Sequence, residues 1–167
     1  MKLCEYTSAS EKDCLAVFDS NVSFSFAAQE RETFQSFLRK LALPYSYYVV
    51  KNDDEIIVAC GGIKLELSNR VARLRWNMVM REFHNQNIGT FLTLSRLYPI
   101  CKSPDIQMVN LYTSQHSYQF YEKMGFVLQK IVPDGIVPGM DEYFMELKLD
   151  KGVKQELERF AKRESLM

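Results

Sequence analysis

The sequence lacks a surplus of charge of either sign, because its 167 residues include 21 lysines and arginines against 21 aspartates and glutamates. A protein that holds nucleic acid or an anionic membrane through its overall charge needs a basic surplus. No apolar run approaches the roughly 18 residues that a membrane-spanning helix requires. We therefore expect neither nucleic acid nor a membrane among its partners.

The sequence also lacks the usual signs of secretion and of metal binding. Its first ten residues, MKLCEYTSAS, contain neither an apolar stretch nor a small-residue cleavage site, so we expect no signal peptide. The four cysteines, at positions 4, 14, 60 and 101, match no zinc or CxxC spacing, and there are only two histidines. We expect a cytoplasmic protein with reduced, mostly buried thiols and no metal.

What the sequence does contain is enough apolar side chain for one substantial core. Apolar residues make up 47% of the chain and aromatic residues 13%, which excludes a disordered protein, and the length suits a single domain. We expect this domain over residues 1–150, followed by an amphipathic helical tail over residues 151–167. We expect the tail to pack on the domain. The alternative is that it forms a homodimer contact, so the oligomeric state could be a monomer or a homodimer.

The first part of the chain predicts a strand and two helices. Residues 2–8 have the pattern of a strand, and Ser10 and Asp13 form a capping box that would begin the first helix. Apolar residues at helical spacing predict a second helix over residues 27–42, which Pro44 would end.

Three strands joined by short turns are expected next, at residues 45–51, 56–67 and 69–80. Gly61 and Gly62 lie inside the second of these strands, which predicts a bulge or the close approach of another backbone. The third strand alternates strictly between apolar and polar residues. It would present Leu74, Trp76, Met78 and Met80 on one face and Arg73, Arg75 and Asn77 on the other.

The rest of the chain predicts alternating helices and strands. A helix begins near Gly89, a strand at residues 107–113 and a helix at 116–124 follow, and residues 126–132 and 142–149 form a closing hairpin. Short turns between the three middle strands imply antiparallel pairing, and a strand–helix–strand step implies a parallel, right-handed crossover. We expect an α/β fold of the mixed α+β type, with one mixed sheet and helices on both of its faces.

The loop before Gly89 has the features of an anion site. The first turn of a helix has unpaired backbone N–H groups and a positive dipole end, and a glycine there lets a ligand approach closely. Asn85 and Asn87 tolerate left-handed backbone angles, which can bend backbone amides into a concave nest. The loop therefore suits a pyrophosphate, although an ordinary crossover loop would share these features.

The stretch SYQFYEKMGF, residues 117–126, combines a helix stop with a tyrosine that the stop does not explain. Gly125 suits the left-handed position just past a helix end, and Phe126 would fold back onto the last turn. That stop accounts for the glycine and the phenylalanine. The helix stop does not explain why a tyrosine stands at position 121.

Residues 112–126, YTSQHSYQFYEKMGF, resemble the second signature of the GNAT superfamily of N-acetyltransferases, in which Tyr-Glu-Lys-x-Gly-Phe follows a strand. Residues 84–89, HNQNIG, are similar to the first signature, Arg/Gln-x-x-Gly-x-Gly/Ala. The resemblance covers roughly residues 3–149. It implies the GNAT fold, a mostly antiparallel mixed sheet of about seven strands that is splayed between strands four and five.

The resemblance implies that acetyl-coenzyme A, as cosubstrate, lies in the cleft between the splayed strands. Strand residues would pair with the pantetheine arm, an N–H there would support the oxyanion, and the loop amides would hold the pyrophosphate. The sequence departs from the family pattern at His84, where arginine or glutamine is usual, at Asn87, which replaces the first glycine, and at Ser114, where many members carry asparagine. The implied cofactor-binding residues are Met78, Val79, Met80, His84, Asn85, Gln86, Asn87, Ile88, Gly89, Thr90, Ser114, Ser117 and Tyr121.

The resemblance also implies direct transfer of the acetyl group to a primary amine of a small molecule or peptide, with Tyr121 as the general acid for the departing thiolate. The reference pKa of tyrosine is about 10 and that of a thiol about 8.5, so a modest downward shift would make Tyr121 effective. Tyr118 is the backup. Glu66 and Asp141 are the candidate bases, although a water relay or an already neutral amine would need neither. Asp141 could instead bind an ammonium group.

Two alternatives stay open. The chain could be a non-catalytic domain that binds or senses acyl-coenzyme A with a degenerate pyrophosphate loop, or an interaction domain that has lost the cleft. The acceptor amine also stays open, because residues 19–34 and 133–142, which would shape its pocket, lie outside both signatures.

Overall fold

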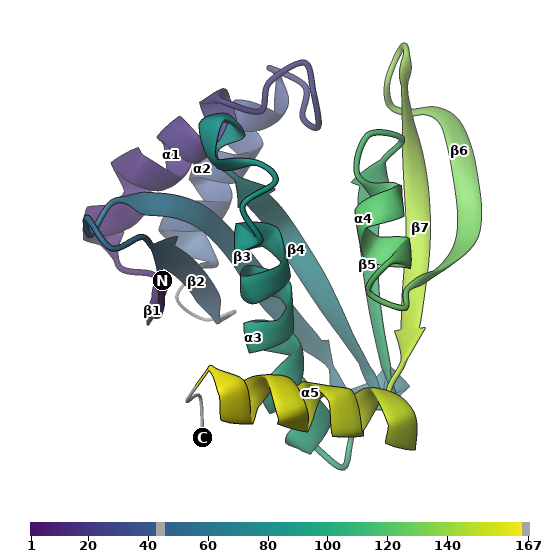
Figure 1. The fold of residues 1–167 in the computed structure, drawn as a ribbon. Coiled ribbons are helices and arrows are strands. Elements are labelled where there is room, and N and C mark those ends of the chain that lie inside the picture. The colour runs from purple at the N-terminus through teal and green to yellow at the C-terminus, as the bar shows by residue number, and fades with distance from the viewer. Residues whose placement is uncertain (43–45, 165–167) are drawn as a thin grey trace.

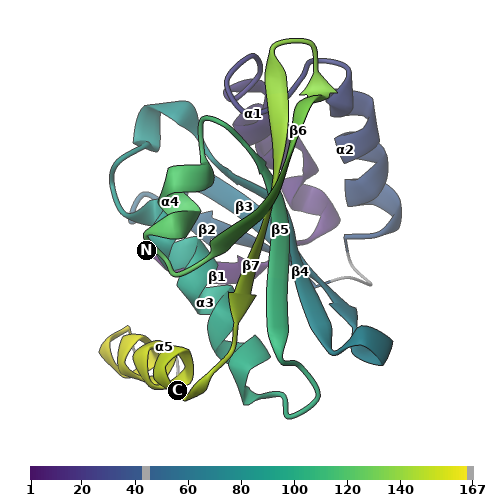
Figure 2. The same cartoon turned by 90° about the vertical axis from the view of Figure 1, so that its right-hand side faces the viewer.

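The computed structural model describes residues 1–42 and 46–164 and contains a seven-stranded sheet with the order β1-β2-β3-β4-β5-β7-β6. Figure 1 and, turned by 90°, Figure 2 show helices on both faces of this sheet. All neighbouring strands are antiparallel except β4 and β5, which run parallel. The predicted fold class is confirmed. The strands are β1 (Lys2–Glu5), β2 (Tyr47–Lys51), β3 (Ile57–Glu66), β4 (Val71–Val79), β5 (Met108–Ser114), β6 (Val127–Val137) and β7 (Met140–Lys148), and the helices are α1 (Glu11–Asp19), α2 (Glu30–Lys40), α3 (Ile88–Lys102), α4 (Tyr118–Glu122) and α5 (Lys151–Arg163).

The sheet opens between its two parallel strands. Among the described residues, β4 and β5 pair over three positions, from Val71 opposite Met108 to Arg73 opposite Asn110. Both strands continue beyond this short ladder, and Figure 1 shows them diverging toward their carboxyl ends. The splay between the fourth and fifth strands is therefore present.

Apolar clusters hold the helices to opposite faces of the sheet. On one face, Phe18 of α1 and Phe34 of α2 pack against Trp76 of β4. On the other face, Leu97 of α3 and Leu157 of α5 belong to one cluster with residues of β5 and α4. The helices α3 and α4 therefore lie on the same face of the sheet.

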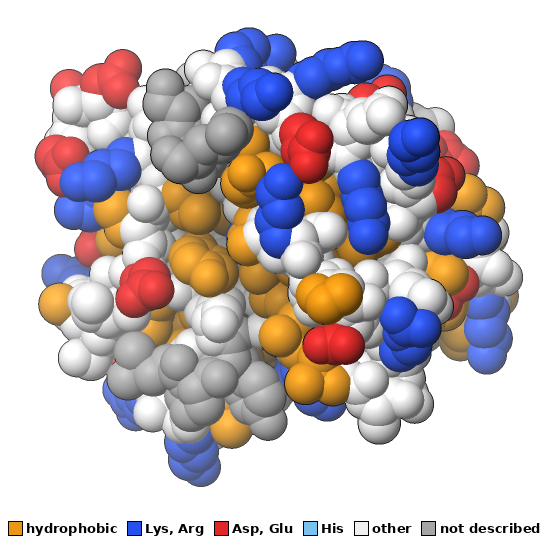
Figure 3. Space-filling model, turned by 90° about the horizontal axis from the view of Figure 1, so that it is seen from below, with side chains coloured by type: hydrophobic (Ala, Val, Ile, Leu, Met, Phe, Trp, Pro, Cys, Tyr) orange, Lys and Arg blue, Asp and Glu red, His pale blue; other side chains and the backbone are white. Residues whose placement is uncertain are grey.

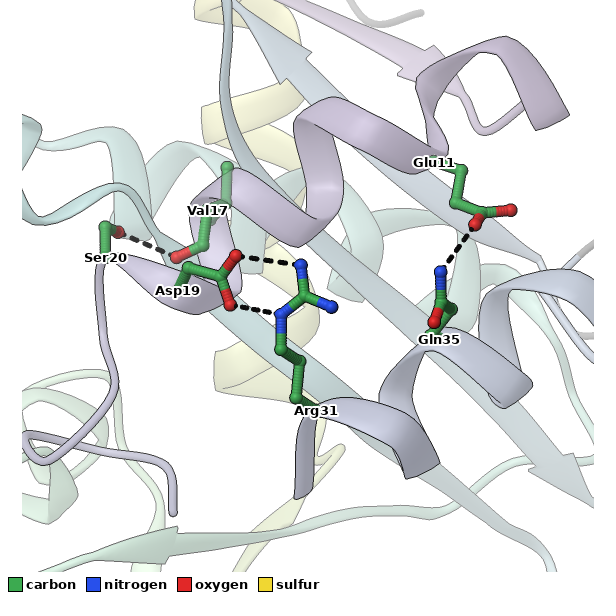
Figure 4. A network of polar contacts seen from close by, with 6 residues as sticks. All are labelled: Glu11, Val17, Asp19, Ser20, Arg31 and Gln35. Carbon is green, nitrogen blue, oxygen red and sulfur yellow. Dashed lines mark hydrogen bonds and ion pairs between the residues drawn. The ribbon is translucent and has the colours of Figure 1, made fainter. Parts of the chain in front are cut away.

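Polar side chains tie α1 to α2 above the first core (Figure 4). Arg31 donates from Nε to Oδ1 of Asp19 at 2.6 Å and from Nη2 to Oδ2 at 3.0 Å, and Gln35 donates from Nε2 to Oε1 of Glu11 at 3.0 Å. The pair of Arg31 and Asp19 is exposed, so it contributes little stability. It connects the two helices that the aromatic core holds together.

A bulge in β4 overturns the predicted strict alternation of that strand. The register of β3 against β4 shifts between Cys60 and Gly62, and the backbone of Trp76 enters the left-handed region with φ 50°. One extra residue in a strand reverses the phase of the side chains that follow. Leu74 therefore lies in the core on the α3 side, whereas Trp76 and Met78 lie with α1 and α2. The prediction of one apolar face for this strand is wrong.

The bulge predicted at Gly61 and Gly62 is confirmed as a register shift at this position, although the extra residue lies in the facing strand β4. Side chains rather than another backbone approach the two glycines. A Cβ on Gly61 would lie 2.6 Å from Nη1 of Arg96, and a Cβ on Gly62 would lie 2.6 Å from Cδ2 of Tyr47. Either contact is shorter than real Cβ contacts, so a side chain at either position would displace Arg96 or Tyr47.

The start of the chain differs from its prediction at two points. β1 ends at Glu5 because a 3-10 turn follows it. Ser10 has helical backbone angles and makes no side-chain cap hydrogen bond, so the predicted capping box is wrong. Pro44, predicted to end the second helix, lies outside the described residues.

The final hairpin is longer than predicted. β6 continues to Val137 because the register against β7 shifts between Val132 and Val137, and this shift absorbs most of the segment expected to be a loop. The chain turns at Gly139, whose φ is 82°.

The C-terminal α5 packs on the domain through its apolar side, as predicted. Leu157 and Phe160 are buried, and the Phe160 ring lies 6.4 Å from that of Phe91 in α3. No helix in the described residues is long and apolar enough to cross a membrane. Figure 3, seen from below, shows acidic and basic side chains interspersed with apolar ones, without a patch of one sign.

Replacing Asp150 with alanine is expected to destabilise the protein by about 1 kcal/mol, because Asp150 caps α5. Its Oδ1 accepts from the N–H of Val153 at 2.9 Å. Thermal unfolding should show a midpoint lower by about 2–4 °C. Asp150→Asn, which keeps the acceptor oxygen, is the control and should unfold close to the wild type. Equal losses in both variants would assign the effect to charge instead of capping.

Candidate active site

The chain passes from β4 to α3 through a loop with two left-handed asparagines. Asn85 has φ 62° and Asn87 has φ 61°, in agreement with the tolerance of asparagine for this region. Asn87 begins α3 without a side-chain cap hydrogen bond, and the N–H of Phe91 donates to its carbonyl at 3.0 Å. The N–H groups of residues 88–90 thus lack partners within the helix and can bind an anion.

Gly89 brings the start of α3 against α4. A Cβ on Gly89 would lie 3.3 Å from Cζ of Phe120 and 3.6 Å from Cγ2 of Val79. α3 follows the carboxyl end of β4, and α4 follows β5, which ends at the buried Ser114. The candidate anion site and the helix that carries Tyr121 therefore meet at the open end of the splay.

Some of the backbone predicted to pair with the pantetheine arm already has internal partners. The carbonyl oxygen of Val79 accepts from Nδ2 of Asn21 at 2.8 Å and lies 2.9 Å from Nε2 of His84. The N–H of Met80 and that of His84 donate to backbone carbonyls at 2.8 Å and 3.2 Å. No sequence pattern pointed to Asn21, because nothing in the sequence distinguishes an asparagine that will be buried from other asparagines in loops after helices.

The other predicted binding residues of this region fall into two groups. Met78 and Ile88 have buried side chains within the apolar cores, so only their backbone can face a ligand. Gln86 is exposed in the loop, and Thr90 is partly exposed in the first turn of α3.

The loop after α1 crosses the open end of the splay. The hydroxyl oxygens of Ser25 and Ser117 lie 3.3 Å apart. The Phe24 ring stacks on that of His116 with centroids 5.1 Å apart, and it lies 5.8 Å from the ring of His84. The loop thus contacts the segment after β4 and the segment after β5.

Tyr121 is buried on α4 and is 6% exposed. Its ring centroid lies 4.9 Å from that of Phe120 and 5.7 Å from that of Phe126. Gly125 has φ 87°, and the N–H of Phe126 donates to the Tyr121 carbonyl at 3.1 Å. The predicted helix stop is confirmed.

The environment of Tyr121 raises its pKa, which is the direction opposite to the modest downward shift that would make it a more effective acid. Burial has the largest effect on this pKa, because it removes water from the phenolate. The guanidinium of Arg96 and a polar contact with Asn77 lower the pKa but do not cancel the effect of burial. Tyr121 is therefore protonated at neutral pH and can donate a hydrogen bond to a developing anion.

Arg96 of α3 is the charged residue that acts on Tyr121, and sequence reasoning missed it. Its side chain is 0% exposed. Nε donates to the Leu92 carbonyl at 2.9 Å, and Nη1 donates to the Gly62 carbonyl at 3.1 Å and to Oδ1 of Asn77. An arginine inside the otherwise uncharged helix segment FLTLSRLYPI is the signal that could have found it.

The structure does not bring the candidate base Glu66 to Tyr121. Glu66 lies at the far end of β3, opposite Val71, where β4 and β5 are still paired. Its Oε1 lies 3.2 Å from Nζ of Lys64 and 3.8 Å from Nη1 of Arg73. The hydrogen bond from Lys64 and the charge of Arg73 lower the pKa of Glu66, so its carboxylate holds these cations instead of taking a proton.

Asp141 and Tyr118 belong to the β5–β7 side of the opening. Oδ1 of Asp141 accepts from the N–H of Asp134 at 2.9 Å, and its N–H donates to Oε1 of Gln115 at 2.9 Å, so this residue fastens the hairpin. The Tyr118 ring stacks on that of Tyr143 with centroids 4.7 Å apart. Among the described residues, no carboxylate shifts the pKa of Tyr121.

The four cysteines are unpaired, and Cys14, Cys60 and Cys101 are buried, as predicted. Within residues 1–42 and 46–164, no group of three or more histidine, cysteine, aspartate or glutamate side chains is placed to hold a metal ion. The independence of metal stays a prediction.

A family model described as the acetyltransferase (GNAT) domain matches residues 44–128, just over half of the chain. The chain belongs to the GNAT family. The match contains the β4–β5 opening, the loop before α3 and the helix that carries Tyr121, so it covers the site just described. No curated protein matches the chain.

Solved structures of GNAT proteins share this fold. A protein from Desulfovibrio desulfuricans, assigned to the GNAT family of acetyltransferases, has a TM-score of 0.74 and 15% identity over 89% of this chain and 99% of its own. An aminoglycoside 6'-N-acetyltransferase complexed with coenzyme A has a TM-score of 0.69 and 14% identity over 90% and 98%. The ribosomal-protein-S18-alanine N-acetyltransferase of Escherichia coli has a TM-score of 0.69 and 16% identity over 89% and 94%. At these identities the likeness shows the fold alone.

Membership of the GNAT family supports acyl transfer with an acyl-coenzyme A as cosubstrate. The residues present fit such a ligand at its pyrophosphate, because the first turn of α3 has no side-chain cap and follows two left-handed asparagines. The carbonyl of Val79 fits less well, since a pantetheine arm that paired with it would displace Asn21 and His84.

Proposed function

We propose that this GNAT protein transfers the acetyl group of acetyl-coenzyme A directly to a primary amine of a small molecule or peptide. The observation that carries the proposal is the meeting of an uncapped helix start and a buried, protonated tyrosine at the open end of the β4–β5 splay. The two groups suit the two ends of the cosubstrate, the pyrophosphate and the thioester. The unpaired thiols favour a reducing compartment such as the cytoplasm.

The binding residues follow from the backbone groups that remain available. The N–H groups of residues 85–90 would hold the pyrophosphate, and residues 78–80 would line the pantetheine arm. Ser114 and Ser117 would border the arm from the β5 side. The bound cosubstrate supplies an activated thioester, which an amine can attack without an acyl-enzyme.

Tyr121 would protonate the departing sulfur. Its raised pKa keeps the proton on the hydroxyl at neutral pH, so the acid is present in every molecule. We expect the acceptor amine to lose its proton to water, because neither of the two candidate bases is available to take it. Glu66 and Asp141, the two bases considered from the sequence, are engaged elsewhere.

The proposed acceptor is a primary amine, either of a small molecule or of a peptide. Two of the structural neighbours are named for an aminoglycoside and for the alanine of a ribosomal protein. The fold therefore serves both small and peptide acceptors, and it does not choose between them for this chain.

A non-catalytic acyl-coenzyme A sensor is the second candidate. The occupied carbonyl of Val79 and the replacement of the first signature glycine by Asn87 favour it, because both would weaken productive seating of the thioester. Such a sensor would bind the cosubstrate and release no thiol.

Thermal unfolding with and without acetyl-coenzyme A tests binding first. Ligand at about 100 times Kd adds roughly 2.7 kcal/mol, which should raise the midpoint by about 5–11 °C. Release of free thiol is then followed with a panel of polyamines, aminoglycosides and peptides with free N-termini. A shift with thiol release supports the enzyme, and a shift without release from any amine supports the sensor. No shift at millimolar ligand contradicts both.

A further inference from the structure

Arg96 carries a charge into the interior of the protein, and no acidic side chain of the described residues forms an ion pair with it. The titratable groups that act on it are Tyr121 of α4, Tyr47 and Tyr48 of β2 and Cys60 of β3, and none of them is a carboxylate. Burial lowers the pKa of Arg96 to about 10, so the guanidinium stays charged at neutral pH. A buried, unpaired charge is strongly unfavourable unless its surroundings compensate for it.

Neutral acceptors hold this guanidinium in one place. Leu92 and Gly62 provide carbonyl oxygens at 2.9 Å and 3.1 Å, and Asn77 provides Oδ1. Gly61 leaves the room that the guanidinium needs, because a Cβ there would lie 2.6 Å from Nη1. Nη2 has no hydrogen-bond partner among the described residues. These contacts fix the position of the charge without neutralising it.

Asn77 connects the charge to Tyr121. The bulge at Trp76 turns Asn77 toward α3, where its Oδ1 accepts from Arg96. The same side chain has a polar contact with Tyr121, and both Arg96 and Asn77 lower the pKa of Tyr121 against the effect of burial. The Asn77 amide thus acts on both the guanidinium and the phenol.

We propose that Arg96 is a positioning residue whose fixed, unneutralised charge, acting beside Asn77, makes the Tyr121 hydroxyl a stronger proton donor to the departing sulfur. The inference rests on the proposed function, because it assigns Arg96 a part in its acid step. In that step the O–H bond of Tyr121 breaks, an S–H bond forms, and the tyrosinate that remains recovers a proton from solvent. A nearby positive charge stabilises the tyrosinate and so favours the transfer.

The alternative role for Arg96 is structural, as a tie between α3 and β3 through the Gly62 carbonyl. A tie of this kind would contribute to folding stability. It would leave the titration of Tyr121 unchanged in any variant that still folds.

The test titrates the tyrosines of the free, full-length protein by NMR, with a carbon-13 label at Cζ. The resonance of Tyr121 is assigned from the variant Tyr121→Phe. Arg96→Gln removes the charge and keeps hydrogen-bonding groups, and Arg96→Lys keeps the charge. We expect Arg96→Gln to raise the pKa of Tyr121 by roughly 1–3 units and to lower kcat more than it changes KM. Arg96→Lys should have a pKa of Tyr121 and a kcat close to those of the wild type.

A second measurement needs no substitution of Arg96, in case Arg96→Gln does not fold. In the wild type, Tyr121 should titrate at lower pH than Tyr47, a buried tyrosine whose pKa is raised well above the ordinary value. Titration of Tyr47 before Tyr121 would overturn the inference. So would a folded Arg96→Gln protein whose Tyr121 titrates as in the wild type. Failure of the proposed function looks different, since the wild type would then release no thiol whatever the titrations show.

Discussion

Replacing Tyr121 with phenylalanine is expected to lower kcat for acetyl transfer by about 10²–10⁴-fold, the usual contribution of a general acid. The new side chain keeps the ring that packs on Phe120 and Phe126, so the fold and the cleft should survive. The rise in unfolding temperature with acetyl-coenzyme A should therefore stay as in the wild type. Steady-state release of free thiol measures the loss, and thermal unfolding measures the binding.

Tyr118→Phe is the matched control for this experiment. It removes a hydroxyl from the same helix, but the ring stacks on Tyr143 of β7. We expect its kcat to stay close to that of the wild type. Equal losses in the two variants would contradict the assignment of the acid to Tyr121, and a large loss in Tyr118→Phe alone would transfer the role to the backup.

The pH profile gives the same assignment without a substitution. The raised pKa of Tyr121 means that the acid form persists through neutral and mildly alkaline solution. Activity that depends on this proton should fall only above about pH 10, the ordinary value for tyrosine.

Replacing Phe34 with alanine is expected to destabilise the protein by about 3–5 kcal/mol. The Phe34 side chain is 0% exposed. Its ring lies 5.0 Å from that of Trp76, 5.5 Å from that of Phe18 and 6.3 Å from that of Tyr47. The cavity left behind would be lined by aromatic rings, which cannot collapse into it without moving the sheet or the helices.

Urea denaturation measures this loss as a lower midpoint at constant slope. Leu41→Ala is the control, because Leu41 follows the same helix but is 39% exposed, and surface substitutions usually change stability by about 0.5 kcal/mol or less. A Phe34→Ala protein as stable as Leu41→Ala would mean that the aromatic cluster does not hold α2 to the sheet. We also expect weaker acetyl-coenzyme A binding in Phe34→Ala, because Phe34 packs on the residue that forms the β4 bulge.

Much of the fold followed from local patterns in the sequence. Turn residues and apolar runs placed the strands, and the glycine pair at 61–62 correctly predicted a bulge. The alternation of β4 failed because a bulge depends on what both faces of the strand meet. Arg75 and Trp76 both turn toward α2, where Arg75 lies over the Phe37 ring with Cζ 5.5 Å from its centroid. No periodicity within β4 contains that information.

The site was predictable only where a motif marked it. The loop before α3 and the position of Tyr121 came from the two signatures. The direction of the Tyr121 pKa shift could not be predicted from the signatures, because it depends on burial by residues distant in sequence. Arg96 and Asn21 were missed for the same reason, since their partners lie 34 and 58 residues away along the chain.

The short ladder between β4 and β5 also separates two halves of the sheet that come from different parts of the sequence. The strands β1 to β4 come from residues 2–79, and β5, β6 and β7 come from residues 108–148, so each half of the sheet is one contiguous stretch. Each half forms its strand pairs within its own stretch of sequence, although β1 pairs with β2 across the helices α1 and α2. The halves then dock through three residue pairs, and α5 returns from the second half to lie across α3 of the crossover. The opening is thus a seam between two locally built units, and a ligand can enter it without breaking a strand pair.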